Sequence, residues 1–158
     1  TGENPMLDGV GPGAWANRPD EPEMTMHNEP RFKPLRTLEK FHVDKNDPDP
    51  RGMEVFGAGG ELAGTVADIW VDRVEPLIVF FEVDLNDGGS NVMVPINFSR
   101  VNRWKRVITV RAIYAHQFKD IPKLASPDLI TMLEEEKITA YFGAGTLYAD
   151  DQRAEPLI

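Results

Sequence analysis

Six carboxylates occur within one otherwise apolar stretch of the sequence, GTVADIWVDRVEPLIVFFEVDLND, which spans residues 64–87. Alternate acids on a sheet with one solvated face are usually ordinary surface groups. Acids that are crowded under a cover lose solvation and repel one another, and both effects raise their pKa toward the range in which they carry protons. The stretch therefore indicates either the wet face of a sheet or a set of proton-carrying groups. The six residues are Asp68, Asp72, Glu75, Glu82, Asp84 and Asp87.

The three histidines are the other groups that exchange protons near neutral pH. They are far apart in the sequence, at His27, His42 and His116, and lack the HxH and HExxH spacings of metal sites. His42 lies in a strand-like FHV segment, which favours a structural role. His27, in MTMHNEPRF, is interpreted either as a solvated surface group or as a proton-exchanging group beside Glu29.

Motifs for nucleotides, calcium and nucleophilic catalysis are incomplete. FGAGGELAG has Leu62 where GxGxxG requires glycine, and DPDPRGMEVFGA ends on Ala58 where a calcium loop has glutamate. The chain has no cysteine and no GxSxG elbow. A net charge of −9 argues against nucleic acid, because phosphate binding depends on clustered Lys and Arg. We therefore expect no metal site and no nucleic-acid partner.

One basic segment, SRVNRWKRV, interrupts this acidic chain. It places Arg100, Arg103, Lys105 and Arg106 around Trp104. Tryptophan beside Lys and Arg is typical of membrane interfaces. Two interpretations stay open: a charged turn between strands, and a contact with an acidic partner or with lipid headgroups.

Short strands are expected to position these groups. Residues 66–72 and 77–85 alternate with a period of two, and NDGGSN at 86–91 predicts a hairpin turn. A return strand follows at 91–96, and another strand is expected at 106–113. Large apolar side chains share the acidic face in this pattern, so we expect that face to be covered. The series predicts a mainly β fold, a small antiparallel barrel or curled sheet.

One helix is predicted near the end of the chain, over about residues 127–142. Ser126 is expected to cap it, Pro127 suits its first position, and Gly143 is expected to end it. Residues 149–158 are treated as a tail.

The first 40 residues are predicted to form an extended arm. Eight of the 13 prolines lie within the first 50 residues, and proline excludes long helices and central strands. The apolar residues of this region indicate an arm that lies on a surface and buries anchors rather than a disordered segment. These anchors are Met6, Leu7, Val10, Trp15, Phe32 and Leu35.

Several segments in combination resemble the H subunit of the purple-bacterial photosynthetic reaction centre. They are GTVADIWVDRVEP, FFEVDLNDGGSNVMVPI and FKDIPKLASPDLITMLEEEKITAYFGAGTLYA, while the arm segment NPMLDGVGPGAWANRPDEPE resembles the part of that subunit before its barrel. The barrel segments are also similar to the wider PRC-barrel family. The resemblance implies a PRC-type barrel with its helix over residues 41–148, and an arm over 1–40 that docks on the barrel and on partner subunits.

The resemblance also implies a function. The H subunit is a non-catalytic subunit that caps the L and M subunits, stabilises the quinone side and assists proton delivery to the secondary quinone. It binds no pigment, because bacteriochlorophyll, bacteriopheophytin, quinones and non-haem iron belong to partner subunits. The expected location is the cytoplasmic face of the photosynthetic inner membrane, with an upstream transmembrane helix that is absent from this chain as the anchor.

Site residues follow from the resemblance position by position. Asp72 and Glu75, in WVDRVEP, match acids near the proton path to the secondary quinone. His27 matches one of two surface histidines where protons enter, and Glu29 stands at the position of the second. Val79 replaces an arginine near the acids, so the local charge balance is expected to differ. The remaining four acids of the stretch are then expected to be ordinary surface groups: Asp68, Glu82, Asp84 and Asp87.

Two other functions are alternatives to the reaction-centre subunit. A free-standing PRC-barrel adaptor, such as the barrel of the ribosome maturation factor, should lack the Pro-rich arm. A small hydrolase has only scattered histidines in its favour. Membrane lipids are expected as further partners, and the candidates for partner or lipid contact are Trp15, Arg100, Arg103, Trp104 and Lys105.

Overall fold

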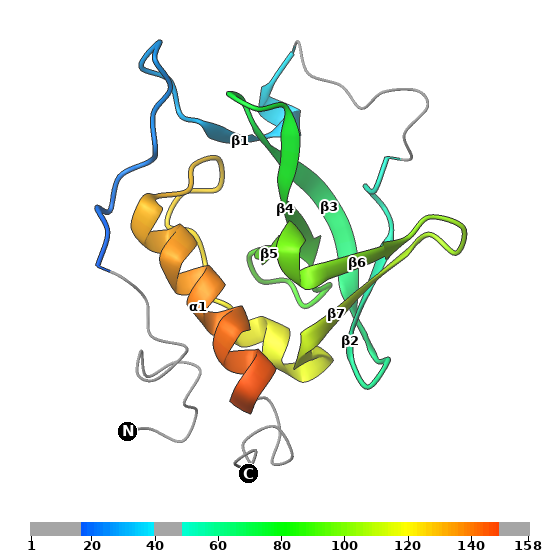
Figure 1. Ribbon diagram of the computed structural model, residues 1–158. Coiled ribbons are helices and arrows are strands. Elements are labelled where there is room, and N and C mark those ends of the chain that lie inside the picture. Colours follow the sequence, from blue (N-terminus) through cyan, green and yellow to red (C-terminus); the bar gives the residue numbers. More distant parts are fainter. Residues whose placement is uncertain (1–16, 40–48, 149–158) are drawn as a thin grey trace.

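A computed structural model describes residues 17–39 and 49–148, which form one strongly curled sheet and a C-terminal helix (Figure 1). Trp15, His42 and the tail at 149–158 lie outside the described residues. The strands are β1 (Phe32–Pro34), β2 (Glu54–Ala58), β3 (Leu62–Asp72), β4 (Leu77–Asp84), β5 (Val92–Pro95), β6 (Ser99–Asn102) and β7 (Val107–Tyr114). The short 3-10 helices are η2 (Leu35–Thr37), η3 (Ile96–Phe98) and η4 (Ala115–Asp120), and the α-helix is α1 (Met132–Tyr148).

The strand order is β5-β4-β3-β2-β7-β6, and β1 pairs with β3 off this path. β5 and β6 lie at opposite ends of the order, yet only the three residues of η3 join them along the chain. The two edges of the sheet must therefore lie close together. This short connection explains why the sheet curls into a half-barrel instead of lying open.

The antiparallel prediction is wrong for one pair of strands. β2 and β7 run parallel, with Glu54 opposite Val107 and Val55 opposite Ile108, whereas the other pairs are antiparallel. β5 and β6 run in the same direction because η3 continues the chain from one edge to the other. β7, which reverses after β6, therefore returns alongside β2 in the same direction.

Strand β3 departs from simple alternation. Its pairing with β4 shifts around Ala67 and again between Trp70 and Val71. The sequence pattern predicts that Ala67, Ile69 and Val71 share a face, but Ala67 is exposed while Ile69 and Val71 are buried. A bulge adds one residue to a strand and rotates the following side chains. Side chains on both faces of β3 are also buried, since the five consecutive residues 68–72 are all buried.

The helix begins later than predicted and ends later. It spans Met132–Tyr148, so the expected helix over 127–142 is wrong at both ends. Thr131 and Glu134 form a capping box: the Glu134 backbone N–H donates to Thr131 Oγ1 at 3.0 Å, and the Thr131 N–H donates to Glu134 Oε1 at 2.9 Å. Ser126, the expected cap, instead forms an isolated bridge with Leu129.

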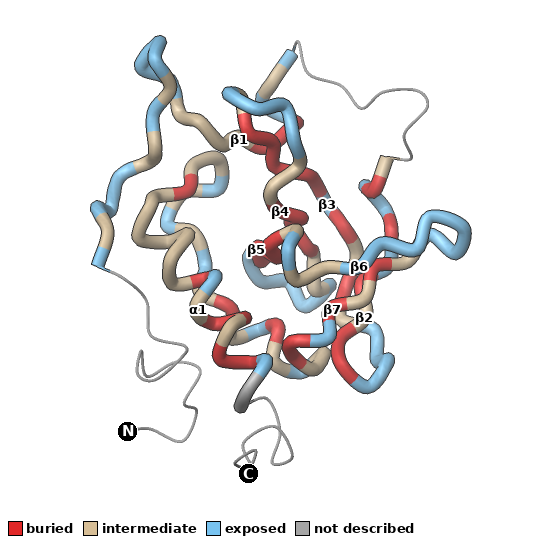
Figure 2. The backbone as a smooth tube through the Cα atoms, in the orientation of Figure 1, coloured by how far each residue is buried: buried red, intermediate tan, exposed pale blue. Residues whose placement is uncertain are grey.

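The core lies between the curled sheet and α1, as the buried segments in Figure 2 show. It includes Trp70 and Phe81 from the sheet and Tyr141 and Phe142 from the helix, all essentially inaccessible to solvent. Leu35, from the arm, belongs to the same core. Residues 17–39 thus form part of the folded unit, since their apolar side chains and one strand pack on it.

The arm also completes the start of the helix. The backbone N–H groups of Met132 and Leu133 donate to the carbonyl oxygens of Glu21 and Pro19, at 2.8 and 3.0 Å. The first N–H groups of a helix have no acceptor within the helix, and here the arm supplies acceptors for two of these groups. Figure 1 shows the arm passing α1 before it reaches the sheet.

Candidate functional site

Two turns meet at one end of the molecule and carry the predicted proton-path residues. We call residues 24–30 of the arm and residues 73–76 between β3 and β4 the paired turns. The arm reverses through a bridge between Met24 and Pro30. The Arg73 backbone N–H donates to the Arg31 carbonyl at 2.8 Å, and the Arg73 side chain donates to the Pro30 carbonyl and forms an ion pair with Glu29. These contacts bind the arm turn to the sheet turn.

Asp72 is buried at the base of the paired turns. Arg31 binds it with both ends of its guanidinium, Nε to Oδ1 at 2.9 Å and Nη2 to Oδ2 at 2.8 Å. The backbone N–H groups of Val74 and Glu75 also donate to Oδ1. Burial acts to raise the pKa of Asp72, but these hydrogen bonds and the Arg31 charge outweigh it and leave the pKa below its ordinary value. Asp72 is therefore a fixed negative charge in this conformation.

Glu75 and His27 are exposed on the two turns. Glu75 lies in the turn after Asp72, between the exposed side chains of Val74 and Leu77. The backbone N–H of His27 donates to Thr25 Oγ1 at 3.3 Å, which helps to close the arm turn. The structure thus brings all four predicted residues onto one end of the molecule. His27 and Glu29 lie on the arm turn, Glu75 lies on the sheet turn, and Asp72 ends β3 directly before that turn.

Two acids expected at the surface are buried instead, so that expectation is wrong. Asp68 is 3% exposed and Glu82 is 7% exposed, and they face each other across β3 and β4. The Arg36 Nη1 atom donates to Asp68 Oδ2 at 3.0 Å and to Glu82 Oε1 at 2.8 Å. Its Nη2 atom donates to Asp128 Oδ1 at 2.9 Å. We call these four residues the Arg36 cluster.

Glu82 has further partners. Its Oε1 accepts from Trp70 Nε1 at 2.9 Å, and its Oε2 accepts from Asn91 Nδ2 at 2.8 Å. The Arg36 cluster is thus a bonded link between arm, sheet and the loop before α1, in agreement with the rule that buried charges are paired. Of the other two acids, Asp87 is exposed as expected and Asp84 is half-buried, each accepting a backbone N–H of its turn.

Glu135 is a half-buried acid that the sequence pattern did not single out. Among the described residues its Oε2 atom is buried without a hydrogen-bond partner. Burial raises the pKa of Glu135 to about 7, against the opposing positive charges of Arg18 and Arg31 and with the support of the negative charges of Glu23 and Glu136. Glu135 belongs to the charged run EEEK, residues 134–137, which interrupts the apolar residues of the helix. The apolar residues on either side of this run could have indicated the burial, because they place one of its acids on the side of the helix that faces the core.

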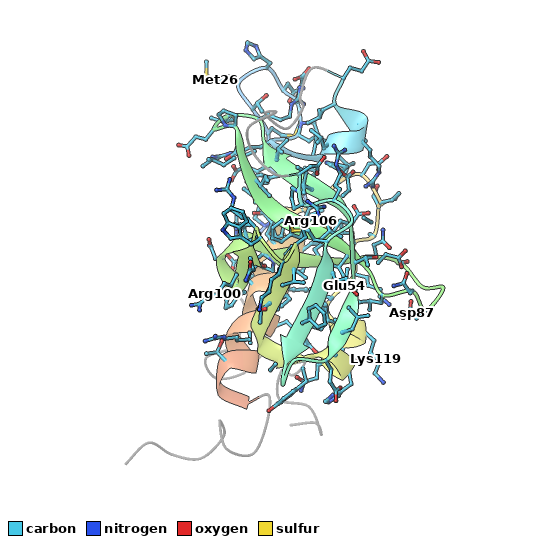
Figure 3. All side chains as sticks on the ribbon, turned by 90° about the vertical axis from the view of Figure 1, so that its right-hand side faces the viewer. Met26, Glu54, Asp87, Arg100, Arg106 and Lys119 are labelled. Atoms are coloured by element: carbon cyan, nitrogen blue, oxygen red, sulfur yellow. The ribbon has the colours of Figure 1, made fainter. Side chains whose placement is uncertain are left out.

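The basic segment lies on a different surface. Arg100 belongs to β6, and Arg103, Trp104, Lys105 and Arg106 form the turn that leads to β7. Trp104 is 97% exposed. Figure 3 labels Arg100 and Arg106 well below Met26, which marks the paired turns. The structure thus separates the contact candidates of the hairpin from the proton-path candidates.

No group of three His, Cys, Asp or Glu side chains within residues 17–39 and 49–148 is arranged to hold a metal ion. In the same ranges, no helix has the length and apolar character needed to cross a membrane.

Two family models match the chain, each over a different part of it. The model of the PRC-barrel domain matches residues 43–117, which include β2 to β7. The chain is thus a PRC-barrel protein, in agreement with its curled sheet and with the C-terminal helix α1. The model of the photosynthetic reaction centre, H-chain N-terminal region, matches residues 1–37. Together the two matches make it an H-subunit-like member of the PRC-barrel family, which confirms the resemblance.

Proposed function

We propose that this chain caps the L and M subunits of a photosynthetic reaction centre on the cytoplasmic side and assists proton delivery to the secondary quinone. The H-chain family to which it is similar is a structural subunit of a reaction centre. The proposal makes the chain a non-catalytic subunit. In this proposal the partner subunits bind the cofactors, which are bacteriochlorophyll, bacteriopheophytin, quinones and non-haem iron. Membrane lipids are the remaining partners that we propose.

One observation carries the proposal: the exposed apolar side chains gather around the proton-path candidates. Seven large hydrophobic side chains are exposed in the described part of the chain, and four of them flank the paired turns. They are Met24, Met26, Val74 and Leu77, with Met26 99% exposed. Exposed apolar groups that are rimmed by charged ones mark interaction surfaces. The paired turns are therefore the surface that we assign to the L and M subunits.

The chemistry assigned to this surface follows from quinone reduction. Forming a quinol consumes two protons at a site removed from water, so protons must pass along acids and waters. A partner that covers an acid takes it out of bulk water, and a desolvated carboxylate holds a proton more readily. Glu75, exposed between two apolar side chains, is the group placed to be covered in this way. Asp72 remains charged against Arg31 and positions the turn, while His27 and Glu29 lie on the arm side, toward the entrance of the path.

The test is Glu75→Gln in the assembled reaction centre. We expect the second electron and proton transfer to the secondary quinone to slow by about tenfold to a hundredfold, since an amide cannot relay a proton and general acid–base groups contribute on this scale or more. The measurement is the transfer rate after a second flash, followed across pH. Glu61→Gln is the matched control, because Glu61 is an exposed acid on the hairpin between β2 and β3. Unchanged rates at all pH values would contradict the proposal.

A free-standing PRC-barrel adaptor of the ribosome maturation type is the second candidate. Such a protein should lack the Pro-rich arm, whereas residues 1–37 match the H-chain N-terminal region. The described part of the arm also contributes a strand and Leu35 to the folded unit. Both observations favour the reaction-centre assignment.

A further inference from the structure

The charges of this chain are distributed very unevenly along its sequence. Residues 88–119 contain no Asp or Glu and six of the 17 Lys and Arg residues, although the chain has 26 acids. This segment runs from the β4–β5 turn through β5, β6 and β7 to η4. A basic surface on a protein of net charge −9 attracts anions despite the charge of the whole molecule, because exposed charges act over about 10 Å at moderate salt.

Two arginines of this segment share the outer face of the hairpin formed by β6 and β7. Arg100 pairs with Thr109 in the register of the two strands, and Arg111 lies two residues beyond Thr109 on the same face. The two guanidinium groups therefore extend from neighbouring positions of one surface. The nearest acid along the neighbouring strand β2, Glu54, pairs with Val107 and so lies across β7 from Arg100.

A hollow of about 400 Å³ lies beside these arginines. Among the described residues, the polar side chains that line it are guanidinium, hydroxyl and amide groups. A lining of this kind offers several hydrogen-bond donors to a phosphate, which guanidinium groups bind well. The polar residues that line it are Asn97, Ser99, Arg100, Thr109, Arg111 and Thr146.

The tip of the same hairpin carries an aromatic side chain in water. Trp104 lies between Arg103 and Lys105 and is 97% exposed, and Val101 on β6 is exposed as well. Charges on an edge strand such as β6 also discourage pairing with another chain. That explanation accounts for Arg100 but not for an exposed indole, nor for the hollow on the side of the hairpin.

We propose that the β6–β7 hairpin binds the surface of a bilayer that contains anionic phospholipid. Trp104 enters the headgroup layer, and the hollow beside Arg100 and Arg111 receives a lipid phosphate. A protein partner would need about 800 Å² on each side of a specific interface, which one hairpin tip does not offer. A lone tryptophan between basic residues is the pattern of membrane interfaces. The inference deepens the proposed function and rests on it only for the presence of a membrane.

The experiment measures binding of the 158-residue chain to vesicles, without any reaction-centre subunit. Vesicles of phosphatidylcholine alone are compared with vesicles of phosphatidylcholine and phosphatidylglycerol. In a Trp15→Phe background, emission comes from the buried Trp70 and from Trp104. We expect a blue shift with the anionic vesicles only, which added salt reverses. Trp104→Ala should abolish the shift and leave the thermal unfolding of the protein unchanged.

Charge variants test the hollow. Each Lys or Arg near an anionic surface contributes about 1 kcal/mol, so Arg100→Gln and Arg111→Gln should each lower vesicle binding about fivefold. Lys123→Gln is the matched control, an exposed cation outside the hairpin, and should have little effect. Equal binding to both kinds of vesicle, or unchanged binding of the arginine variants, overturns the proposal. Binding of inorganic phosphate in the hollow without any binding to vesicles also overturns it. Association of Trp104 with an acidic protein instead of a lipid surface overturns it as well. Because the vesicles lack L and M, failure here leaves the capping proposal to its own test.

Discussion

Two arginines of the arm bind the buried acids of β3 and β4. Arg31 holds Asp72, and Arg36 holds Asp68 together with Glu82. These three acids belong to the stretch that the sequence presents as a wet face. Instead, the arm is attached to the sheet through them. Among the six acids of that stretch, Glu75 is the one that is both exposed and located on the paired turns.

The Arg36 cluster should contribute clearly to stability. Arg36→Ala leaves two buried carboxylates that face each other without a cation, so we expect unfolding to become easier by about 3 kcal/mol. The measurement is urea unfolding of the chain. In a background with Asp68→Asn and Glu82→Gln, the same substitution should cost much less, because no buried charge is then left unpaired. An equal loss in both backgrounds would show that the carboxylates are not what Arg36 stabilises.

Glu135 predicts a pH dependence of stability. Its folded-state pKa of about 7 lies above the ordinary value of 4.5, so the folded chain retains this proton over an interval in which the unfolded chain has lost it. Its stabilising contribution is complete below about pH 4.5 and is lost as the pH rises through about 7. Glu135→Gln should therefore raise the melting temperature relative to wild type above pH 7, and change it little near pH 4. Thermal unfolding across pH measures this, with Glu61→Gln as the control. A difference that does not vary with pH would exclude the assignment.

The position of α1 against the sheet depends on one of its two glycines. Gly145 lies where the helix approaches β7, and an added Cβ would be 2.5 Å from Ile113 Cγ2 and 2.6 Å from the Ala112 carbonyl oxygen. Gly143, two residues earlier, has nothing within 4 Å of such a Cβ. The sequence pattern interpreted Gly143 as the end of the helix, but the helix continues through both residues.

The two glycines form a matched pair for a test. Gly145→Ala should destabilise the fold by about 1–3 kcal/mol, because overpacking against backbone atoms forces the helix away from β7. Gly143→Ala should instead stabilise it by about 0.5–1 kcal/mol, because alanine favours a helix over glycine. Chemical unfolding of both variants measures the difference. If both substitutions have the same sign, close approach of the helix to β7 is not the reason for Gly145.

For the whole molecule, local patterns predicted more than long-range ones. The alternation over 77–85 and the turn NDGGSN predicted β4, its turn and β5, because a hairpin is specified by neighbouring residues. The capping box of Thr131 and Glu134 was also readable, but Ser126 and Pro127 offered a competing start. The parallel pairing of β2 and β7 depends on how η3 joins the edges of the sheet, which no local pattern contains.

The residues of the candidate site show the same difference between what local patterns predict and what depends on distant parts of the sequence. A family resemblance, and not spacing alone, selected His27, Glu29, Asp72 and Glu75. The structure places Asp72 at the base of the paired turns and the other three on them. The burial of Asp68 and Glu82 was missed because their cation, Arg36, comes from an arm more than thirty residues away in sequence. A period-two pattern also assumes that one face of a strand is buried and that the other face is exposed to water. In β3, side chains on both faces are buried.

The contact between the arm and the start of α1 has a consequence for biosynthesis. The carbonyl oxygens of Pro19 and Glu21 accept hydrogen bonds from Leu133 and Met132, so a segment made early is fastened by a helix made late. During translation this part of the arm lacks those partners until α1 has left the ribosome. This part of the arm therefore cannot form these hydrogen bonds while the barrel is being synthesised. They form as a late step of folding, after the helix has been made.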